Sequence, residues 1–319
     1  MTTVGDGKFS WKALRAETID AFDPDHLPKS IELPALPHAV SEFVEKAANP
    51  DFDIKVLSAI VERDSGLTVE LLKHVNSASY ALRAPVRSVK DAVMHIGINA
   101  AKMYLLAAGM RAASRAIKSK LINQRNFWNE SLQRALFARE LARKLKLDSG
   151  LAFLGGLLQD FLLPVLTNHF DGDYISYMST DFMDGRDLCD WEQERFGWNH
   201  ASAGAYCAAR WHFPDDLLCA IHFHHSLNTT LEPRGPEFFK LFPVAMSGLL
   251  PDQLRQTQYG FRELIQVDKR SASIGLEEIC RVVDEEQMRL AEGYEIPNHL
   301  SNVLADTRRK MALDSAMAG

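Results

Sequence analysis

Apolar residues recur at the spacing of an amphipathic helix along most of the chain after residue 33. The first such face comprises Val40, Phe43, Val44 and Ala47, which stand at i, i+3, i+4 and i+7. Asn49-Pro50 ends this pattern, and Asp53 is placed to cap the next helix. Further helices are predicted by the apolar sets within 54–61, 67–75, 89–96 and 103–110.

The second half repeats this pattern with longer helices. They are expected within 128–145, 153–158, 188–195, 199–212 and 276–290, and from Pro214 onward. No segment shows the alternation of a half-buried strand, so the sequence predicts an all-α protein. Residues 1–29 are mostly polar and predict an N-terminal arm that packs loosely or contacts a partner. A polar tail is expected after residue 290.

Composition narrows the class of protein without indicating its chemistry. The chain has 319 residues, a formal net charge of −6, 46% hydrophobic and 24% charged residues, which is typical of soluble globular domains. Its four cysteines form no CxxC pair, so neither a disulfide scaffold nor a cysteine-rich zinc site is expected. The N-terminus does not read as a secretory signal, and no apolar run reaches the roughly 20 residues that span a bilayer. We therefore expect a cytoplasmic protein without membrane insertion.

Charge is unevenly distributed along the chain. Ten Lys and Arg residues fall between Arg111 and Lys146, against two acidic residues, whereas 276–296 is acidic. Such a basic run is typical of a solvated helix face. It also suits a surface for anions or an acidic partner, or an intramolecular match to the acidic stretch.

A series of short motifs runs in order along residues 33–225. They are Leu33-Pro34-Ala35-Leu36-Pro37, Asp64 with Leu67, His74-Val75-Asn76-Ser77-Ala78, Tyr80, Pro85-Val86 with Ser88, Ala92 with Gly97, Trp128 with Ser131, Phe153 through Asp160, Glu192 with Phe196-Gly197, and His200, Gly204, Trp211, Pro214, Ile221, His224 and His225. Together they make residues 30–250 resemble the HDOD family, bacterial signalling output domains related to HD phosphohydrolases.

The resemblance implies an HD-domain-like helical bundle with an additional N-terminal helical lobe. We expect an arm over 1–29, an HDOD domain over 30–250 with lobes 30–115 and 120–250, and a C-terminal helical extension over 251–319. The spans outside 30–250 are too short for a receiver, EAL or GGDEF domain. A signal is therefore expected to arrive through a separate protein or a small ligand.

Some of these motifs have a physical explanation. Pro34 and Pro37 hold a stiff extended entry into the first helix. Asn76 and Ser77 offer side chains that satisfy the unpaired carbonyl groups at a helix end. Gly155-Gly156 lets two helices approach closely.

HD hydrolases bind metal through a His, a His-Asp pair and a distal Asp. By resemblance, the first His position falls on Glu130, the pair reads Gln159-Asp160, and the distal Asp aligns with Met246. A methionine thioether is a poor ligand for a hard divalent ion. Because three of the four usual ligands are replaced, the resemblance implies that ordinary HD catalysis is absent.

A second set of polar residues remains as a candidate site. It comprises Asp160, His200, His224 and His225, to which Glu130 can be added. Helical spacing turns Asp160, His200 and His224 inward, where each needs a partner. Two interpretations stay open: a residual site for a divalent metal or an anion, or a hydrogen-bonded cluster kept as buried scaffolding. We favour scaffolding, with no cofactor and no catalytic residue, and expect His222 to face outward.

Three functions follow from these observations. The first, which we favour, is a non-catalytic bacterial signal-transduction module that binds signalling proteins and can respond to a small-molecule or nucleotide ligand. The second is a divergent metal-dependent phosphohydrolase of the HD superfamily. The third is a nucleotide or nucleic-acid binder that uses the 111–146 basic stretch, although the net charge of −6 does not favour nucleic acid.

Overall fold

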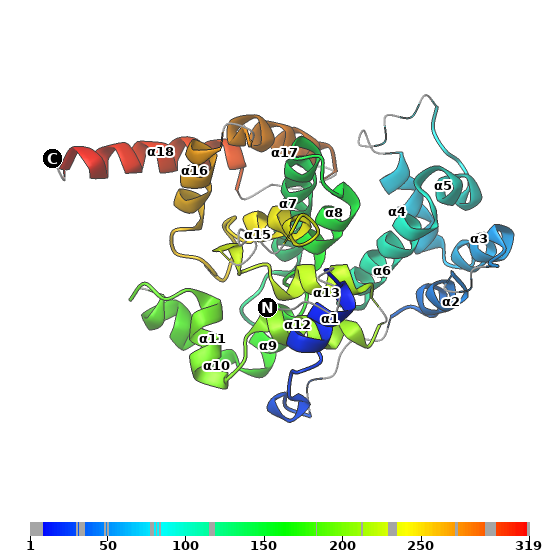
Figure 1. The fold of residues 1–319 in the computed structure, drawn as a ribbon, viewed down its shortest axis with the longest axis horizontal. Helices are drawn as coiled ribbons and strands as arrows, with labels where there is room; N and C mark the ends of the chain where they lie inside the picture. The colour runs from blue at the N-terminus through cyan, green and yellow to red at the C-terminus, as the bar shows by residue number, and fades with distance from the viewer. Residues whose placement is uncertain are drawn as a thin grey trace. The chain divides into compact units, whose positions relative to one another are not determined.

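The computed structural model describes residues 9–29, 31, 36–47, 49, 51–76, 80, 82, 84–114, 119–182, 184–211, 213–228, 235–271, 274–290 and 298–317. Every regular element among these residues is a helix, so the all-α prediction is confirmed (Figure 1). They form two compact units, one over 33–117 and one over 1–32 with 118–319. Leu33-Pro34-Ala35 and Ser77-Ala78 of the motifs lie outside the described residues.

The described residues of the unit 33–117 include five α-helices. They are α2 (His38–Ala47), α3 (Ile54–Glu62), α4 (Ser65–Val75), α5 (Val89–Ile96) and α6 (Ile98–Ser114). Asp53 caps α3 by accepting a hydrogen bond from the Lys55 amide at 2.7 Å, and Asp64 caps α4 through the Leu67 amide at 3.0 Å. The predicted apolar face of α2 is confirmed, because Val40 and Phe43 are fully buried.

The larger unit contains a further set of helices among its described residues. They are α1 (Trp11–Thr18), η1 (Pro24–His26), α7 (Gln124–Lys144), α8 (Ser149–Leu158), α9 (Leu163–His169), α10 (Asp171–Ser176), the π-helix η3 (Tyr177–Asp181), α11 (Leu188–Phe196), α12 (His200–Ala209), α13 (Asp215–His222), η4 (Phe238–Leu241), α15 (Phe242–Ser247), α16 (Gly260–Arg270), α17 (Leu276–Leu290) and α18 (Leu300–Met317). Helix α7 is central, since α8, α15 and α17 all pack against it.

Both ends of the larger unit pack more firmly than the sequence predicts. Helix α1 lies against α13, with Leu14 and Ile19 buried, so the expectation of a loosely packed arm is wrong. The polar tail expected after residue 290 contains helix α18, whose first two amides donate to the Asp284 carboxylate at 2.7 and 2.9 Å. That buried cap joins α18 to α17.

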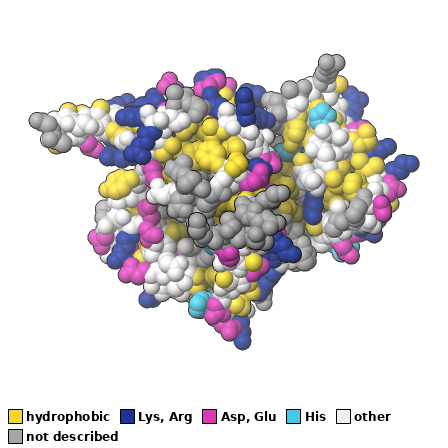
Figure 2. All heavy atoms as spheres, in the orientation of Figure 1, with side chains coloured by type: hydrophobic (Ala, Val, Ile, Leu, Met, Phe, Trp, Pro, Cys, Tyr) yellow, Lys and Arg dark blue, Asp and Glu magenta, His cyan; other side chains and the backbone are white. Residues whose placement is uncertain are grey.

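The acidic helix α17 pairs with the basic helix α7. Arg139 bonds Glu286, and Lys144 bonds Glu278. This arrangement is the intramolecular match that the charge pattern left open. Within the described part of 111–146, carboxylate partners are held by Arg111, Lys120, Arg134, Arg139, Arg143 and Lys144. On the face drawn in Figure 2, basic and acidic side chains are interspersed, which counts against a nucleic-acid surface there.

One stretch, Ser149–His169, is long and apolar enough to cross a membrane, although the sequence predicts none. It comprises α8, the following turn and α9. Of its most apolar 18-residue window, 89% is buried inside the protein. Such burial is typical of a core helix.

Candidate functional site

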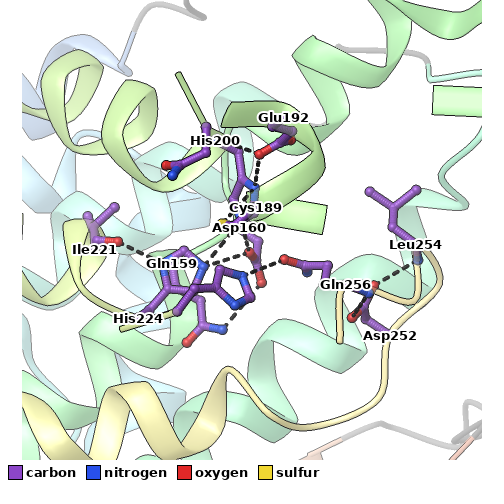
Figure 3. A network of polar contacts seen from close by, with 12 residues as sticks. Gln159, Asp160, Cys189, Glu192, His200, Ile221, His224, Asp252, Leu254 and Gln256 are labelled. Atoms are coloured by element: carbon purple, nitrogen blue, oxygen red, sulfur yellow. Dashed lines mark hydrogen bonds and ion pairs between the residues drawn. The ribbon is translucent and has the colours of Figure 1, made fainter. Parts of the chain in front are cut away.

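Asp160 lies within a buried group of polar side chains that we call the polar node (Figure 3). The node comprises Arg134, Asp160, Glu192, His200, His224, His225 and Asp252. Asp160 directly follows the last turn of α8, where Gly156 lies against α7. A Cβ atom on Gly156 would stand 2.8 Å from the Arg134 carbonyl oxygen, so glycine permits this close approach. The predicted role of Gly155-Gly156 is therefore confirmed at Gly156.

Arg134 extends from α7 and pairs with two carboxylates. Its Nη1 donates to Asp160 Oδ2, and its Nη2 donates to Asp252 Oδ2 at 3.0 Å and to the Leu250 carbonyl at 3.1 Å. Burial alone would raise the pKa of Asp160, but the Arg134 charge and the two histidines hold it well below its ordinary value. Asp160 is therefore ionised and matched by a cation.

Glu192 on α11 orients His200, the first residue of α12. One Glu192 oxygen accepts from His200 Nδ1 at 2.6 Å and from the His200 amide at 2.7 Å. Its other oxygen accepts from the Tyr174 hydroxyl at 2.6 Å. The start of α12 is set by Asn199, whose side chain accepts from the Ser202 amide in a capping box. His200 is thus held from both its backbone and its ring.

His224 and His225 follow the end of α13. His224 Nδ1 donates to the Ile221 carbonyl at 2.6 Å, which turns Nε2 toward Asp160. The His224 Nε2 atom lies 3.2 Å from Asp160 Oδ1, and His200 Nε2 lies 3.3 Å from the same oxygen. His225 Nε2 bonds the Gln256 side-chain oxygen at 2.9 Å. The three rings consequently surround one carboxylate.

The segment 251–258 lies between α15 and α16 and contributes side chains to the node. Besides Asp252, it supplies Gln256, whose side chain reaches His225 and whose carbonyl accepts from the Leu188 amide at 2.8 Å. Gln253 donates to Glu130 at 3.3 Å. Asp160, His200 and His224 are 2%, 1% and 1% exposed, so these three side chains are closed to solvent, whereas His225 is half-buried.

Four of the five residues proposed from the sequence meet. Ligand atoms of Asp160, His200, His224 and His225 lie within 4.8 Å of one another. Glu130 lies outside that group and pairs with Gln253. Burial and the Asp252 charge raise its pKa to about 7.

The replaced HD positions have ordinary structural partners. Gln159 accepts from the Ser247 hydroxyl at 3.0 Å, and Met246 is fully buried in the core. His222 does not face outward as expected: its ring packs against Phe223 with centroids 4.7 Å apart, and burial lowers its pKa to about 4.

Sequence reasoning missed three charged members of the node. Arg134 stood in a run of basic residues, and Asp252 in a segment without helical spacing. Glu192 belonged to the motif series, but nothing in the sequence paired it with His200.

The HDOD domain family matches residues 33–227 of this chain. The chain belongs to the HDOD family. It is 27% identical over 215 residues to an uncharacterised protein of Treponema pallidum (strain Nichols), which covers 66% of this chain. The chain spans 40% of the length of that curated relative.

Two solved structures share the fold of this HDOD chain. An HDOD domain protein of unknown function from Geobacter sulfurreducens is 20% identical, with a TM-score of 0.56 over 86% of this chain and 96% of its own. A candidate phosphohydrolase from Shewanella amazonensis SB2B is 24% identical, with a TM-score of 0.59 over 82% of this chain and 94% of its own. At these identities the likeness establishes the HD-like helical fold alone.

The cations of the HDOD node lie beside carboxylates. Burial opposes protonation of His200, but the neighbouring Glu192 and Asp160 raise its pKa well above the ordinary value. Burial lowers the pKa of His224, which is therefore neutral. The cations Arg134 and His200 thus face the carboxylates of Asp160 and Glu192.

HD phosphohydrolases bind a divalent metal, which raises the question of whether the side chains of the node suit such an ion. Asp160 Oδ1, His200 Nε2 and His224 Nε2 form a triangle with sides of 3.2, 3.3 and 3.3 Å, and Oδ1 accepts no well-aligned hydrogen bond. Their donor types and spacing suit a transition metal. However, Asp160 is already bonded to the buried cation Arg134, and a dication beside it would meet strong repulsion. The complete side-chain set therefore does not fit a divalent metal.

Proposed function

We propose that this HDOD chain is a non-catalytic signal-transduction module that acts by binding a signalling protein. The observation that carries the proposal is the buried ion pair between Arg134 and Asp160. A hydrolytic metal needs a free carboxylate ligand and an open position for water and substrate. Arg134 binds Asp160 Oδ2, and the Asp160, His200 and His224 side chains are all buried, which supports a role without catalysis.

A hydrolysis screen on phosphate monoesters and diesters tests the absence of catalysis. We expect the purified chain, assayed with Mg²⁺, Mn²⁺ or Zn²⁺, to release no more phosphate or alcohol than Asp160→Ala does. The matched control is Asp171→Ala, which removes a surface carboxylate paired with Lys120. Metal-dependent turnover that Asp160→Ala abolishes and Asp171→Ala retains would overturn the proposal.

The partner surface that we propose lies on the unit 33–117. Helices α3, α4 and α5 pack on one another, and each exposes one large apolar side chain: Val56, Val69 and Met94. Exposed apolar side chains on neighbouring helices suit a protein partner. A photo-crosslinking amino acid placed at each position in living cells should capture the same signalling protein. Placed at Glu285 of α17, whose side chain is 44% exposed, it should not capture that protein. Equal capture at Glu285 would contradict this surface.

A metal-dependent phosphohydrolase is the second candidate, and the donor triangle of Asp160, His200 and His224 favours it. This alternative requires a divalent metal cofactor. Purification without chelator followed by elemental analysis separates the candidates. One bound metal ion per chain, lost in His200→Ala together with turnover, would support the hydrolase.

A further inference from the structure

We propose that the Arg134 guanidinium replaces a metal ion in the polar node, and that removing it converts the node into a transition-metal site. The inference rests on the proposed non-catalytic function, since a chain that turned over with bound metal would need no such replacement. It concerns a latent site that Arg134 now blocks.

The contacts of Arg134 resemble those of a bound cation. Its guanidinium joins three oxygen atoms from two segments of the chain: Asp160 Oδ2, and Asp252 Oδ2 with the Leu250 carbonyl. The Arg134 side chain is 3% exposed, and both carboxylates are similarly buried. Two buried carboxylates on one cation require charge compensation, which Arg134 supplies together with the surrounding protons.

The other side of Asp160 presents nitrogen donors that are already oriented. His200 Nδ1 is held by Glu192 and His224 Nδ1 by the Ile221 carbonyl, so both Nε2 atoms point at Asp160 Oδ1. Hydrogen bonds from the second ring nitrogen to a carboxylate and to a carbonyl are typical of metal-ligating histidines. His225 lies within reach of the same group. The guanidinium charge opposes a metal at this position, and a metal that binds there would also displace the proton on His200 Nε2.

Arg134→Met removes that charge and keeps a side chain of similar length. It leaves Asp160 and Asp252 without their common cation, and a dication would compensate both. Imidazole donors with one carboxylate select Zn²⁺ or Co²⁺ over Mg²⁺ or Ca²⁺. We use Co²⁺ as the probe, because its visible absorption reports nitrogen and oxygen coordination.

The chain offers two matched controls. Arg139→Met removes a second buried arginine from α7, one that pairs with Glu286 instead of the node. It should lose comparable stability without binding Co²⁺. Arg134→Lys keeps a positive charge in place and should also bind none.

Full-length wild type and variants are dialysed against Co²⁺ and assayed for metal content, absorption and Tm. We expect Arg134→Met to bind about one Co²⁺ per chain, displaced by Zn²⁺, against less than about a tenth for the wild type and both controls. Co²⁺ should also raise the Tm of Arg134→Met alone. Should Arg134→Met fold only with metal, Co²⁺-dependent recovery of its helical circular dichroism supports the proposal.

Three outcomes overturn the inference. The first is a folded Arg134→Met that binds no Co²⁺. The second is a wild type that binds as much Co²⁺ as Arg134→Met does, and the third is an Arg139→Met that gains the same Co²⁺ site. If Arg134→Met folds neither with nor without Co²⁺, a double variant that combines Arg134→Met with Asp252→Asn is tested, because it also removes the surplus carboxylate. Failure of this double variant to bind Co²⁺ also overturns the inference. The proposed function fails separately, on hydrolysis by the wild type.

Discussion

Arg134 Nη1 donates to Asp160 Oδ2 where the two side chains are 3% and 2% exposed. Water cannot solvate either buried charge, so each charged side chain is stabilised by the other. Removing one partner of such a pair leaves an unpaired buried charge, which is costly even where the intact pair contributes little net stability. The node is therefore a structural element whose single substitutions should be severe.

Asp160→Asn should lower the free energy of unfolding by about 3–5 kcal/mol, because it leaves the Arg134 guanidinium without its principal carboxylate. Urea unfolding followed by circular dichroism measures the change. Asp171→Asn, which removes a surface partner of Lys120, should have little effect. Equal stability of the two variants would show that the ion pair is not formed in solution.

Glu130→Gln should stabilise the protein at pH 8 and leave it almost unchanged near pH 4.5. The pKa of Glu130 is about 7 in the folded chain, against 4.5 as its ordinary value, so the unfolded chain releases this proton first. Stability is lost as the pH rises from 4.5 to 7, and the charged carboxylate costs about 2–3 kcal/mol above that range. Tm values of both proteins from pH 4.5 to 8 test this. A difference that is independent of pH would contradict the buried position of Glu130.

Helices and their caps could be predicted because their signals are local. The periodicity of Val40 and Phe43 marks the buried face of α2, and Asp53 caps α3 as expected. Asp160, His200 and His224 were placed inward by helical spacing alone, and the structure brings them together. Only His200 lies within a helix, since Asp160 and His224 stand in the turns after α8 and α13, so their common environment also depends on how these helices end.

The partners of these residues could not be predicted, because they depend on tertiary contacts. Arg134 is 26 residues from Asp160 in sequence and 118 from Asp252. Nothing around Arg134 distinguishes it from Arg143, which pairs at the surface. The contact requires the close packing of α7 and α8 at Gly156. The sequence predicts a close helix approach at this glycine, but it does not indicate which α7 residue lies against it.

Gly156→Ala should destabilise the protein by about 1–3 kcal/mol, because its Cβ would press on the α7 backbone at Arg134 and force the helices apart. Gly172→Ala in α10 is the matched control, since no atom lies within 4 Å of its added Cβ. The control should be neutral or slightly stabilising, as alanine favours a helix. Thermal unfolding measures both, and a neutral Gly156→Ala would argue against the close α7–α8 contact.

Asn76→Ala should loosen the unit 33–117 locally without affecting the polar node. The sequence predicts that Asn76 satisfies carbonyls at the end of α4, but its side chain instead pairs with the backbone of Val86. Its Nδ2 donates to the Val86 carbonyl at 2.8 Å, and its Oδ1 accepts from the Val86 amide at 2.7 Å.

Losing both hydrogen bonds should cost about 1–2 kcal/mol and speed hydrogen exchange of the Val86 amide about tenfold. Asn76→Asp keeps only the acceptor and should give an intermediate rate. Asn302→Ala on α18, in the other unit, serves as the control and should leave Val86 exchange unchanged. If Val86 exchanges equally fast in wild type and Asn76→Ala, the pairing does not hold the segment after α4, and Asn76 acts only at the helix end.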